Sequence, residues 1–249
     1  MEPVYRLAEL LLRRPLHHGV RWTVETISAV PATGPVLLAS NHISYFDPLA
    51  IAYLANRAGR RVRFLTKAEL FEKAWMARVM RGLGEIPVER GSGDATDSLG
   101  RATAALAAGE MVAVFPEGTI ASDFEPMAGK TGVARLARAA GMPIVPLGLW
   151  GTHRILNRGH RIPLGMRVAV TAVFGDPVAV GPGDNPREAT DRIMGAVCAQ
   201  VARARALYPQ GPRSEADEWW VRRPGTVRLR SCRGRVAQEM LDRAAPDSE

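Results

Sequence analysis

The sequence predicts a single α/β domain with a central mixed, partly parallel sheet flanked by helices. Short apolar runs of strand length alternate along the chain with stretches of helical periodicity. Glycines stand where several helices should end, at Gly59, Gly109 and Gly141. The chain has 249 residues, 47% of them hydrophobic, which is enough for one packed core. These three observations together favour one α/β domain over a fibrous or disordered chain.

The chain opens with a stretch that favours an amphipathic helix, which we assign to residues 1–19. Arg6, Arg13 and Arg14 lie elsewhere on the helical wheel, and Pro15 predicts that the helix breaks there. A basic amphipathic helix of this kind can lie on a membrane surface or pack on its own domain, and the sequence leaves both open. The apolar residues at helical spacing are Val4, Leu7, Ala8, Leu11 and Leu12.

Residues 20–208 form the main predicted domain, in which strands and helices alternate. It begins at Val20 with a half-buried strand, where apolar and polar residues alternate. Asp47 followed by Pro48 predicts a helix start, with Asp47 as the N-cap and Pro48 at the first helical position. Further strands are expected near residues 35–40, 61–66, 85–88, 111–115, 143–149 and 166–174, and helices near 48–58, 68–80, 95–108, 130–140 and 187–207.

The composition changes after Tyr208, so we separate residues 209–249 as a basic C-terminal extension. Pro209, Gly211 and Pro212 resemble a linker, and Trp219–Trp220 follow an acidic stretch. Residues 221–235 contain six arginines and no acidic residue. Such a tail is either a solvated, poorly ordered extension or a lipid-contacting patch with interfacial tryptophans, and the composition favours the first.

The net charge of +8 favours an anionic partner, and it comes from 30 arginines and three lysines. Aromatic residues are not interleaved with the basic stretches, and no nucleic-acid motif is recognisable, so nucleic acid is disfavoured. No apolar run approaches the roughly 18 residues that a spanning helix needs. A secretory signal is not recognisable either. We therefore expect a protein without a transmembrane span that meets anionic lipid or a phosphorylated substrate.

His42 is a candidate general base because it lies on the loop that leaves the carboxyl end of a predicted strand. Open α/β sheets form their binding crevices at such ends. Asp47, five positions later, is close enough for its carboxylate to hold one imidazole nitrogen while the other accepts a proton. Taken alone, the pair fits equally well a histidine that only ties down its loop.

Three further segments carry groups suited to binding a polar or anionic ligand. One strand ends in a turn that contains Glu117 and Gly118, and the glycine permits close backbone approach. Another short strand delivers Arg90 at its end. Lys130 opens a helix, where a lysine and backbone amides can receive an anion. Each of these segments alone is unremarkable.

The order of these segments resembles the glycerolipid acyltransferase family, and in particular bacterial 1-acylglycerol-3-phosphate (lysophosphatidic acid) acyltransferases. The resemblance covers about residues 20–205. Lys67 and its neighbours also resemble a family segment, whereas Ile120 stands where the family commonly has arginine. The other residues that carry the resemblance are Asn41-His42-x-x-x-x-Asp47, Gly84-x-Ile86-x-Val88-x-Arg90, Phe115-Pro116-Glu117-Gly118-Thr119 and Pro143-Ile144-Val145-Pro146.

The resemblance implies a membrane-associated O-acyltransferase. His42 would remove the proton from the acceptor hydroxyl as it attacks a thioester, and Asp47 would orient the imidazole. The acyl donor would be acyl-CoA or acyl-carrier protein, the acceptor lysophosphatidic acid and the product phosphatidic acid, for phospholipid biosynthesis. No metal and no bound cofactor are implied. The expected location is the cytoplasmic face of the cell membrane, with an anionic membrane surface as partner. The implied acceptor-binding residues are Lys67, Arg90, Glu117, Gly118, Thr119 and Lys130.

Two alternatives stay open at this stage. The first keeps the reaction and changes the acceptor to glycerol 3-phosphate, a glycolipid or an amino-lipid, and Ile120 is the residue that keeps it open. The second is a lipid-binding homologue without catalytic activity. The simultaneous presence of His42, Asp47 and Glu117 argues against this second alternative.

Overall fold

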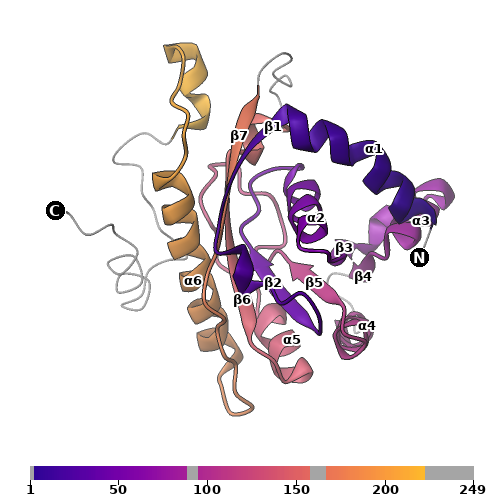
Figure 1. The fold of residues 1–249 in the computed structure, drawn as a ribbon. Coiled ribbons are helices and arrows are strands. Elements are labelled where there is room, and N and C mark those ends of the chain that lie inside the picture. Colours follow the sequence, from indigo (N-terminus) through magenta and orange to yellow (C-terminus); the bar gives the residue numbers. More distant parts are fainter. Residues whose placement is uncertain (1–2, 89–94, 158–166, 222–249) are drawn as a thin grey trace.

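The computed structural model describes residues 3–88, 95–157 and 167–221, which fold into an α/β domain with helices on both faces of a sheet (Figure 1). The sheet has seven strands in the order β1-β7-β6-β2-β5-β3-β4. The β6–β7 pair is antiparallel and the other pairs are parallel, which confirms the predicted mixed sheet. The strands are β1 Val20–Glu25, β2 Val36–Ser40, β3 Val62–Lys67, β4 Ile86–Val88, β5 Met111–Val114, β6 Ile144–Trp150 and β7 Val168–Phe174.

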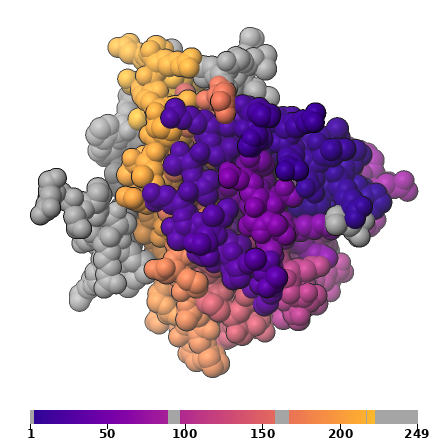
Figure 2. Space-filling view, in the orientation of Figure 1, coloured from indigo at the N-terminus to yellow at the C-terminus, as the bar shows by residue number. Residues whose placement is uncertain are grey.

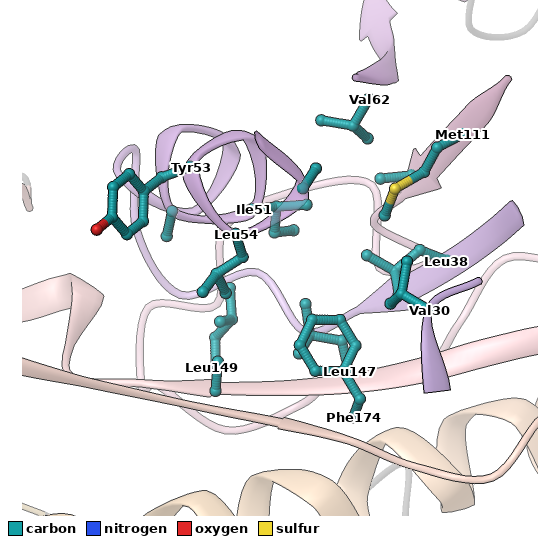
Figure 3. Close-up of a cluster of buried hydrophobic side chains, with 14 of the residues drawn as sticks. Val30, Leu38, Ile51, Tyr53, Leu54, Val62, Met111, Leu147, Leu149 and Phe174 are labelled. Atoms are coloured by element: carbon teal, nitrogen blue, oxygen red, sulfur yellow. The ribbon is translucent and has the colours of Figure 1, made fainter. Parts of the chain in front are cut away.

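Two apolar cores lie on opposite faces of the sheet because side chains alternate along each strand. Leu38 of β2 faces α2, whereas its neighbour Leu37 faces α4, α5 and α6. In Figure 3, Ile51 and Leu54 of α2 point toward this first face of the sheet. The helices are α1 Pro3–Gly19, α2 Asp47–Arg57, α3 Ala74–Leu83, α4 Ala95–Ala107, α5 Gly132–Ala140 and α6 Pro186–Ala206.

The pairing of β2 with β5 brings the two motif-bearing loops together. These strands run parallel in the centre of the sheet, with Val36 opposite Met111 and Ala39 opposite Val114. Both strands therefore end at the same edge, and the loops after them start side by side. A crevice at the carboxyl ends of parallel strands is where α/β folds place their ligands.

The N-terminal helix does not break at Pro15, contrary to the sequence prediction. α1 runs from Pro3 to Gly19 with Pro15 inside it. The last turn is anchored by tertiary contacts, because Leu16 is buried and its carbonyl accepts a 2.8 Å hydrogen bond from Trp22 Nε1. This packing offsets the hydrogen bond that a proline removes from a helix. Figure 2 shows the N-terminal residues spread over one face of the molecule.

The helix expected over residues 68–80 is two elements. A 3-10 turn, Ala68–Phe71, follows β3 directly, and α3 begins only at Ala74. Leu70 and Trp75 are exposed, so no core contact holds the stretch together as one helix. α3 then continues to Leu83 and ends at Gly84, which has φ of 81°.

The described part of the C-terminal extension packs on the domain. A 3-10 helix, η4, spans Glu215–Trp220, and Trp220 is 3% exposed. Trp220 is therefore a buried residue rather than an interfacial one, because the domain itself supplies its apolar surroundings. Most of the arginine-rich stretch lies outside the described residues. In the part of the chain that is described, no helix combines the length and the apolar character that crossing a bilayer requires.

Candidate active site

His42, in the loop that follows β2, forms a hydrogen-bonded pair with Asp47, the first residue of α2. His42 Nδ1 lies 2.9 Å from Asp47 Oδ2. Because a carboxylate oxygen only accepts, we assign the ring proton to Nδ1, which leaves the lone pair on Nε2. The imidazole stacks on Phe115 with a centroid distance of 4.0 Å and lines the main cavity. The ring is thus held in one plane, with Nε2 as the nitrogen that can accept a proton.

Asp47 does not cap α2, contrary to the sequence prediction. The N-cap is Phe46, and Asp47 is the first helical residue. Its Oδ2 turns back to the loop, where it accepts hydrogen bonds from the amides of Ile43 at 2.7 Å and Ser44 at 2.8 Å in addition to the His42 ring. The tight turn between Ser44 and Asp47 brings these amides within reach. Three donors satisfy Oδ2 of this fully buried side chain, whereas its Oδ1 has no hydrogen-bond partner among the described residues.

Two polar side chains to which sequence reasoning assigned no role, Asn41 and Ser44, anchor the same loop. Asn41 pairs with both backbone groups of Leu149, at 3.0 Å and 2.8 Å. The Ser44 hydroxyl lies 3.0 Å from the carbonyl of Thr152 and 2.5 Å from that of Leu156. The partners of both side chains lie more than 100 residues away in the sequence, and Leu149 comes 108 residues after Asn41. The only local signal was the polar pair Ser40–Asn41 at the end of an otherwise apolar strand.

Glu117 lies beneath the cavity rather than in its lining. The residue is 3% exposed, and its carboxyl oxygens accept hydrogen bonds from the amides of His42 at 2.9 Å and Met127 at 3.1 Å. Burial raises the pKa of Glu117 to about 8, although both amide donors oppose the shift. The sequence-based expectation was contact with the acceptor. The structure instead places Glu117 as a brace between the His42 loop and the loop after β5.

Some of the remaining predicted site residues line the cavity and others do not. Lys67, Gly118 and Thr119 line the cavity with His42. Lys130 does not line it, and its side chain packs against Gly118, whose added Cβ would lie 3.0 Å from Lys130 Nζ. Gly118 has φ of 69°, a conformation that favours glycine. Arg90 lies outside the described residues.

A cavity of about 960 Å³ extends from His42 and is lined mainly by apolar side chains. Its walls come from α1, α2, β3, α3 and residues 118–124, so distant segments build it together. Sequence reasoning missed the contributions of α1 and Phe124, because only the tertiary fold brings them to His42. Among the described residues, the lysines and arginines in the lining are Arg13 and Lys67. The apolar lining includes Leu12, Leu16, Leu49, Phe64, Leu65, Met80, Leu83 and Phe115.

Comparison with known proteins places the site in a family. A family model described as "Acyltransferase" matches residues 21–150, slightly more than half of the chain. The chain belongs to the acyltransferase family. The matched range contains the His42–Asp47 pair, Lys67 and the loop that carries Glu117.

Individual relatives of this acyltransferase support the same assignment. A chloroplast 1-acyl-sn-glycerol-3-phosphate acyltransferase of Brassica napus is 28% identical over 162 residues, 59% of this chain and 46% of that protein. A lyso-ornithine lipid O-acyltransferase of Rhizobium meliloti is 30% identical over 159 residues, 60% of this chain and 48% of that protein. The chain thus spans about half the length of these curated relatives.

A solved structure shares the fold of this acyltransferase. The crystal structure of the 1-acyl-sn-glycerophosphate acyltransferase from Thermotoga maritima superimposes with a TM-score of 0.63. The match covers 83% of this chain and 81% of that one, at 23% sequence identity. It supports the α/β architecture described above.

Proposed function

We propose that this protein transfers a fatty acyl group from a thioester donor, acyl-CoA or acyl-carrier protein, to the free hydroxyl of lysophosphatidic acid. The product is phosphatidic acid. The observation that carries the proposal is the His42–Asp47 pair at the wall of an apolar cavity, with His42 Nδ1 2.9 Å from the carboxylate. The names of the relatives supply the reaction class, and the pair supplies a base that fits it.

In the proposed reaction His42 acts as general base and then as general acid. Nε2 takes the proton of the acceptor hydroxyl as its oxygen attacks the thioester carbonyl carbon, which gives a tetrahedral oxyanion. The intermediate collapses with cleavage of the carbon–sulfur bond, and the imidazolium returns the proton to the leaving thiolate. Asp47 holds the ring and stabilises the imidazolium. No protein nucleophile, metal or bound cofactor enters these steps.

The oxyanion needs donors, and we assign this role to the backbone amides of Thr119 and Ile120. Both residues line the cavity next to His42. The amides of Gly118 and His42 are already engaged, with the Phe115 carbonyl at 2.9 Å and Glu117 at 2.9 Å. Within the described ranges, the Thr119 and Ile120 amides have no hydrogen-bond partner. Fixed, unengaged N–H groups are the donors that stabilise a developing oxyanion.

The cavity offers an apolar region for the acyl chain and a basic side chain for the phosphate of the acceptor. Its apolar interior between α1, α2 and β3 suits an acyl chain. Lys67 lines the His42 end and is assigned to the phosphate of the acceptor by a charge-assisted hydrogen bond. Arg90, outside the described residues, keeps its predicted role at the same phosphate. Lys130, behind Gly118, contributes its charge from outside the cavity lining.

A different acceptor is the second candidate, and Ile120 is the observation that favours it. Ile120 lines the cavity beside Thr119 and Ser122, where the family pattern commonly has arginine. The Rhizobium relative is named for a lyso-ornithine lipid acceptor. An acceptor with an amino-acid head group in place of phosphate therefore fits the same dyad and cavity.

The acceptor is a lipid, and we infer that the protein meets it as a peripheral protein at the cytoplasmic face of the cell membrane. Leu7, Leu10 and Leu11 of α1 are 56%, 73% and 62% exposed. α1 also carries Arg6, Arg13 and Arg14, and an apolar helix face with basic neighbours suits anionic lipid.

The test is acyl transfer from labelled palmitoyl-CoA to lysophosphatidic acid in mixed micelles. We expect His42→Ala to lower the rate by about 10²–10⁴-fold, the usual contribution of a general base. His18→Ala, an exposed histidine of α1, is the matched control and should keep wild-type activity. Equal rates for wild type and His42→Ala would refute the mechanism. Transfer only when lyso-ornithine lipid replaces lysophosphatidic acid would select the second candidate.

A further inference from the structure

The chain that follows α6 returns to the domain and is fastened to a short 3-10 turn after β6, η3 (Thr152–Arg154). The attachment centres on Arg154, which is 5% exposed. Its Nη1 donates to the Tyr208 hydroxyl at 3.0 Å and to Gln210 Oε1 at 2.9 Å. Its guanidinium lies 3.9 Å from the Trp220 ring centroid and pairs with Asp217 at 3.5 Å. A buried arginine thus holds the C-terminal segment, residues 208–220, in place.

His153 lies in the same turn and is enclosed by aromatic rings. It is 0% exposed, and its ring stacks on Phe124 at 4.4 Å and lies 4.6 Å from Trp150. Its Nε2 is 3.3 Å from the Trp220 carbonyl, so Nε2 carries the proton. Burial lowers the pKa of His153 to about 3, which keeps the ring neutral. The uncharged ring connects the C-terminal segment to Phe124.

Phe124 in turn reaches the catalytic cavity. It belongs to the loop after β5 and lines the cavity together with His42. Its φ of 60° is unfavourable for a phenylalanine, and such a backbone persists only where the surroundings hold it. Arg205 Nη2 donates to the Phe124 carbonyl at 2.9 Å, and His153 packs on the ring. The amide of Ala121, in the same loop, donates to the His42 carbonyl at 2.8 Å.

We propose that the C-terminal segment is a positioning element for the substrate-binding loop, residues 118–127. The Trp220 ring anchors the segment on Arg154 and Tyr208, and the Trp220 carbonyl meets His153. His153 packs on Phe124, which forms part of the cavity wall with residues 118–122. In this arrangement neither Trp220 nor His153 touches the substrate or the His42–Asp47 pair. The kinetic part of the proposal rests on the proposed function, whereas the structural part does not depend on it.

The deciding experiment is amide hydrogen exchange on the full chain, with Trp220→Ala compared with the wild type. We expect the amides of Ala121, Phe124 and Met127 to exchange roughly tenfold faster or more in the variant, because the loop opens locally more often. The amides of β2 and β5 should not change. Glu218→Gln, an exposed residue of the same 3-10 helix, is the matched control.

Kinetics supply the readout that a merely structural role would not change. In Trp220→Ala the KM for the lysolipid acceptor should rise about tenfold, while kcat at saturation and the pH profile of the dyad stay within about twofold of wild type. Trp220→Phe, which retains an aromatic ring, should restore most of the acceptor affinity. If Trp220→Ala does not fold, Trp220→Leu takes its place and should show a smaller change in the same direction.

Unchanged exchange of the loop amides in a folded Trp220 variant would overturn the proposal. Faster exchange with an unchanged acceptor KM would overturn it as well, because the segment would then stabilise the loop without serving binding. Absence of acyl transfer in the wild type is a different result: it removes the proposed function, and the exchange data alone still decide whether the segment positions the loop.

Discussion

At the residue scale, the site depends on one carboxylate oxygen. Asp47 Oδ2 accepts hydrogen bonds from the His42 ring and from two loop amides, so a single atom fixes the orientation of the imidazole and the position of the loop that carries it. Glu117 holds the same loop from the opposite side through the His42 amide. The two acids therefore share the task of placing His42, and only Asp47 touches its ring.

Asp47→Asn tests this arrangement. The amide keeps the size of the side chain, and it removes the negative charge that, in the proposed mechanism, stabilises the imidazolium in the transition state. We expect kcat to fall by about 10²–10⁴-fold with a small change in KM. Steady-state rates with both substrates varied give the answer, and circular dichroism checks the fold. A variant with wild-type kcat would show that the carboxylate only ties down the loop.

Glu85 predicts a pH dependence of stability. Burial raises the pKa of Glu85 from 4.5 to about 7, although Thr66 Oγ1 donates to it at 2.6 Å. The folded state therefore favours the protonated acid. Protonated Glu85 therefore contributes to the free energy of unfolding. This contribution is fully present below the pKa of the unfolded state, and it is lost as the pH rises through the folded-state pKa of about 7.

Glu85→Gln should remove the loss of stability that ionisation of Glu85 causes as the pH rises. Between about pH 5 and pH 8, the unfolding free energy of the variant should fall less than that of the wild type, by on the order of 2 kcal/mol. Urea unfolding at the two pH values measures it, and Glu72→Gln, an exposed acid of the neighbouring turn, is the control. Identical pH dependence in Glu85→Gln and wild type would contradict the argument.

At the element scale, the centre of the sheet depends on a close approach of β6 and α6. Gly148 of β6 lies against the backbone of α6, where an added Cβ would come 2.2 Å from the carbonyl carbon of Gln200. A backbone atom cannot move aside as a flexible side chain does. The contact matters for the site because β6 carries Leu149, which pairs with Asn41 of the His42 loop.

Gly148→Ala should therefore destabilise the protein by about 3 kcal/mol, the upper part of the usual range for an overpacked core. Gly132→Ala, at the first position of α5, has nothing within 4 Å of the added Cβ and should be close to neutral. Thermal and urea unfolding of both variants measure the difference. Similar stability of the two alanine variants would show that α6 shifts freely on the sheet.

The sequence predicts most elements because local patterns determine them. Short apolar runs give the strands, which are buried at every position in β2, β5, β6 and β7, and glycines in left-handed conformation, such as Gly84 and Gly141, end helices. The errors arise where tertiary packing overrides local preference. Pro15 stays inside α1 because Leu16 is anchored. The helix expected over residues 68–80 divides between Phe71 and Ala74, where the flanking side chains of Leu70 and Trp75 are exposed.

The same limit applies to the site: contacts between residues close in the sequence were predictable, and contacts made by the tertiary fold were not. His42 lies in the loop after β2 and Asp47, five residues later, begins α2, so their pairing follows from spacing. The bracing role of Glu117 depends on Met127 and on the alignment of β2 with β5, which the sequence does not display. The contribution of Phe124 depends on residues 153 and 220, further still along the chain.

At the scale of the whole molecule, the apolar cavity and the exposed apolar residues belong together. Leu12, Tyr45 and Leu70 are all exposed and all line the cavity, so its mouth opens where apolar side chains reach the solvent. α1 extends this surface with Leu7, Leu10 and Leu11. α3, which packs against α1 where Val4 meets Gly82, adds an exposed tryptophan, Trp75. Under the proposed function, this apolar surface would lead a lipid acceptor from a bilayer to the mouth of the cavity.

Vesicle binding tests this orientation. Each exposed leucine that enters the lipid interface contributes up to about 2 kcal/mol, so Leu10→Ser with Leu11→Ser should weaken binding to anionic vesicles by tenfold or more. Val221→Ser, at an exposed apolar residue that follows the 3-10 helix η4, should bind as the wild type does. Flotation with phosphatidylglycerol vesicles measures binding. Because neither leucine lines the cavity, transfer to acceptor presented in detergent micelles should change far less than transfer to acceptor in vesicles. Equal vesicle binding of the double variant and the wild type would place the membrane contact elsewhere on the molecule.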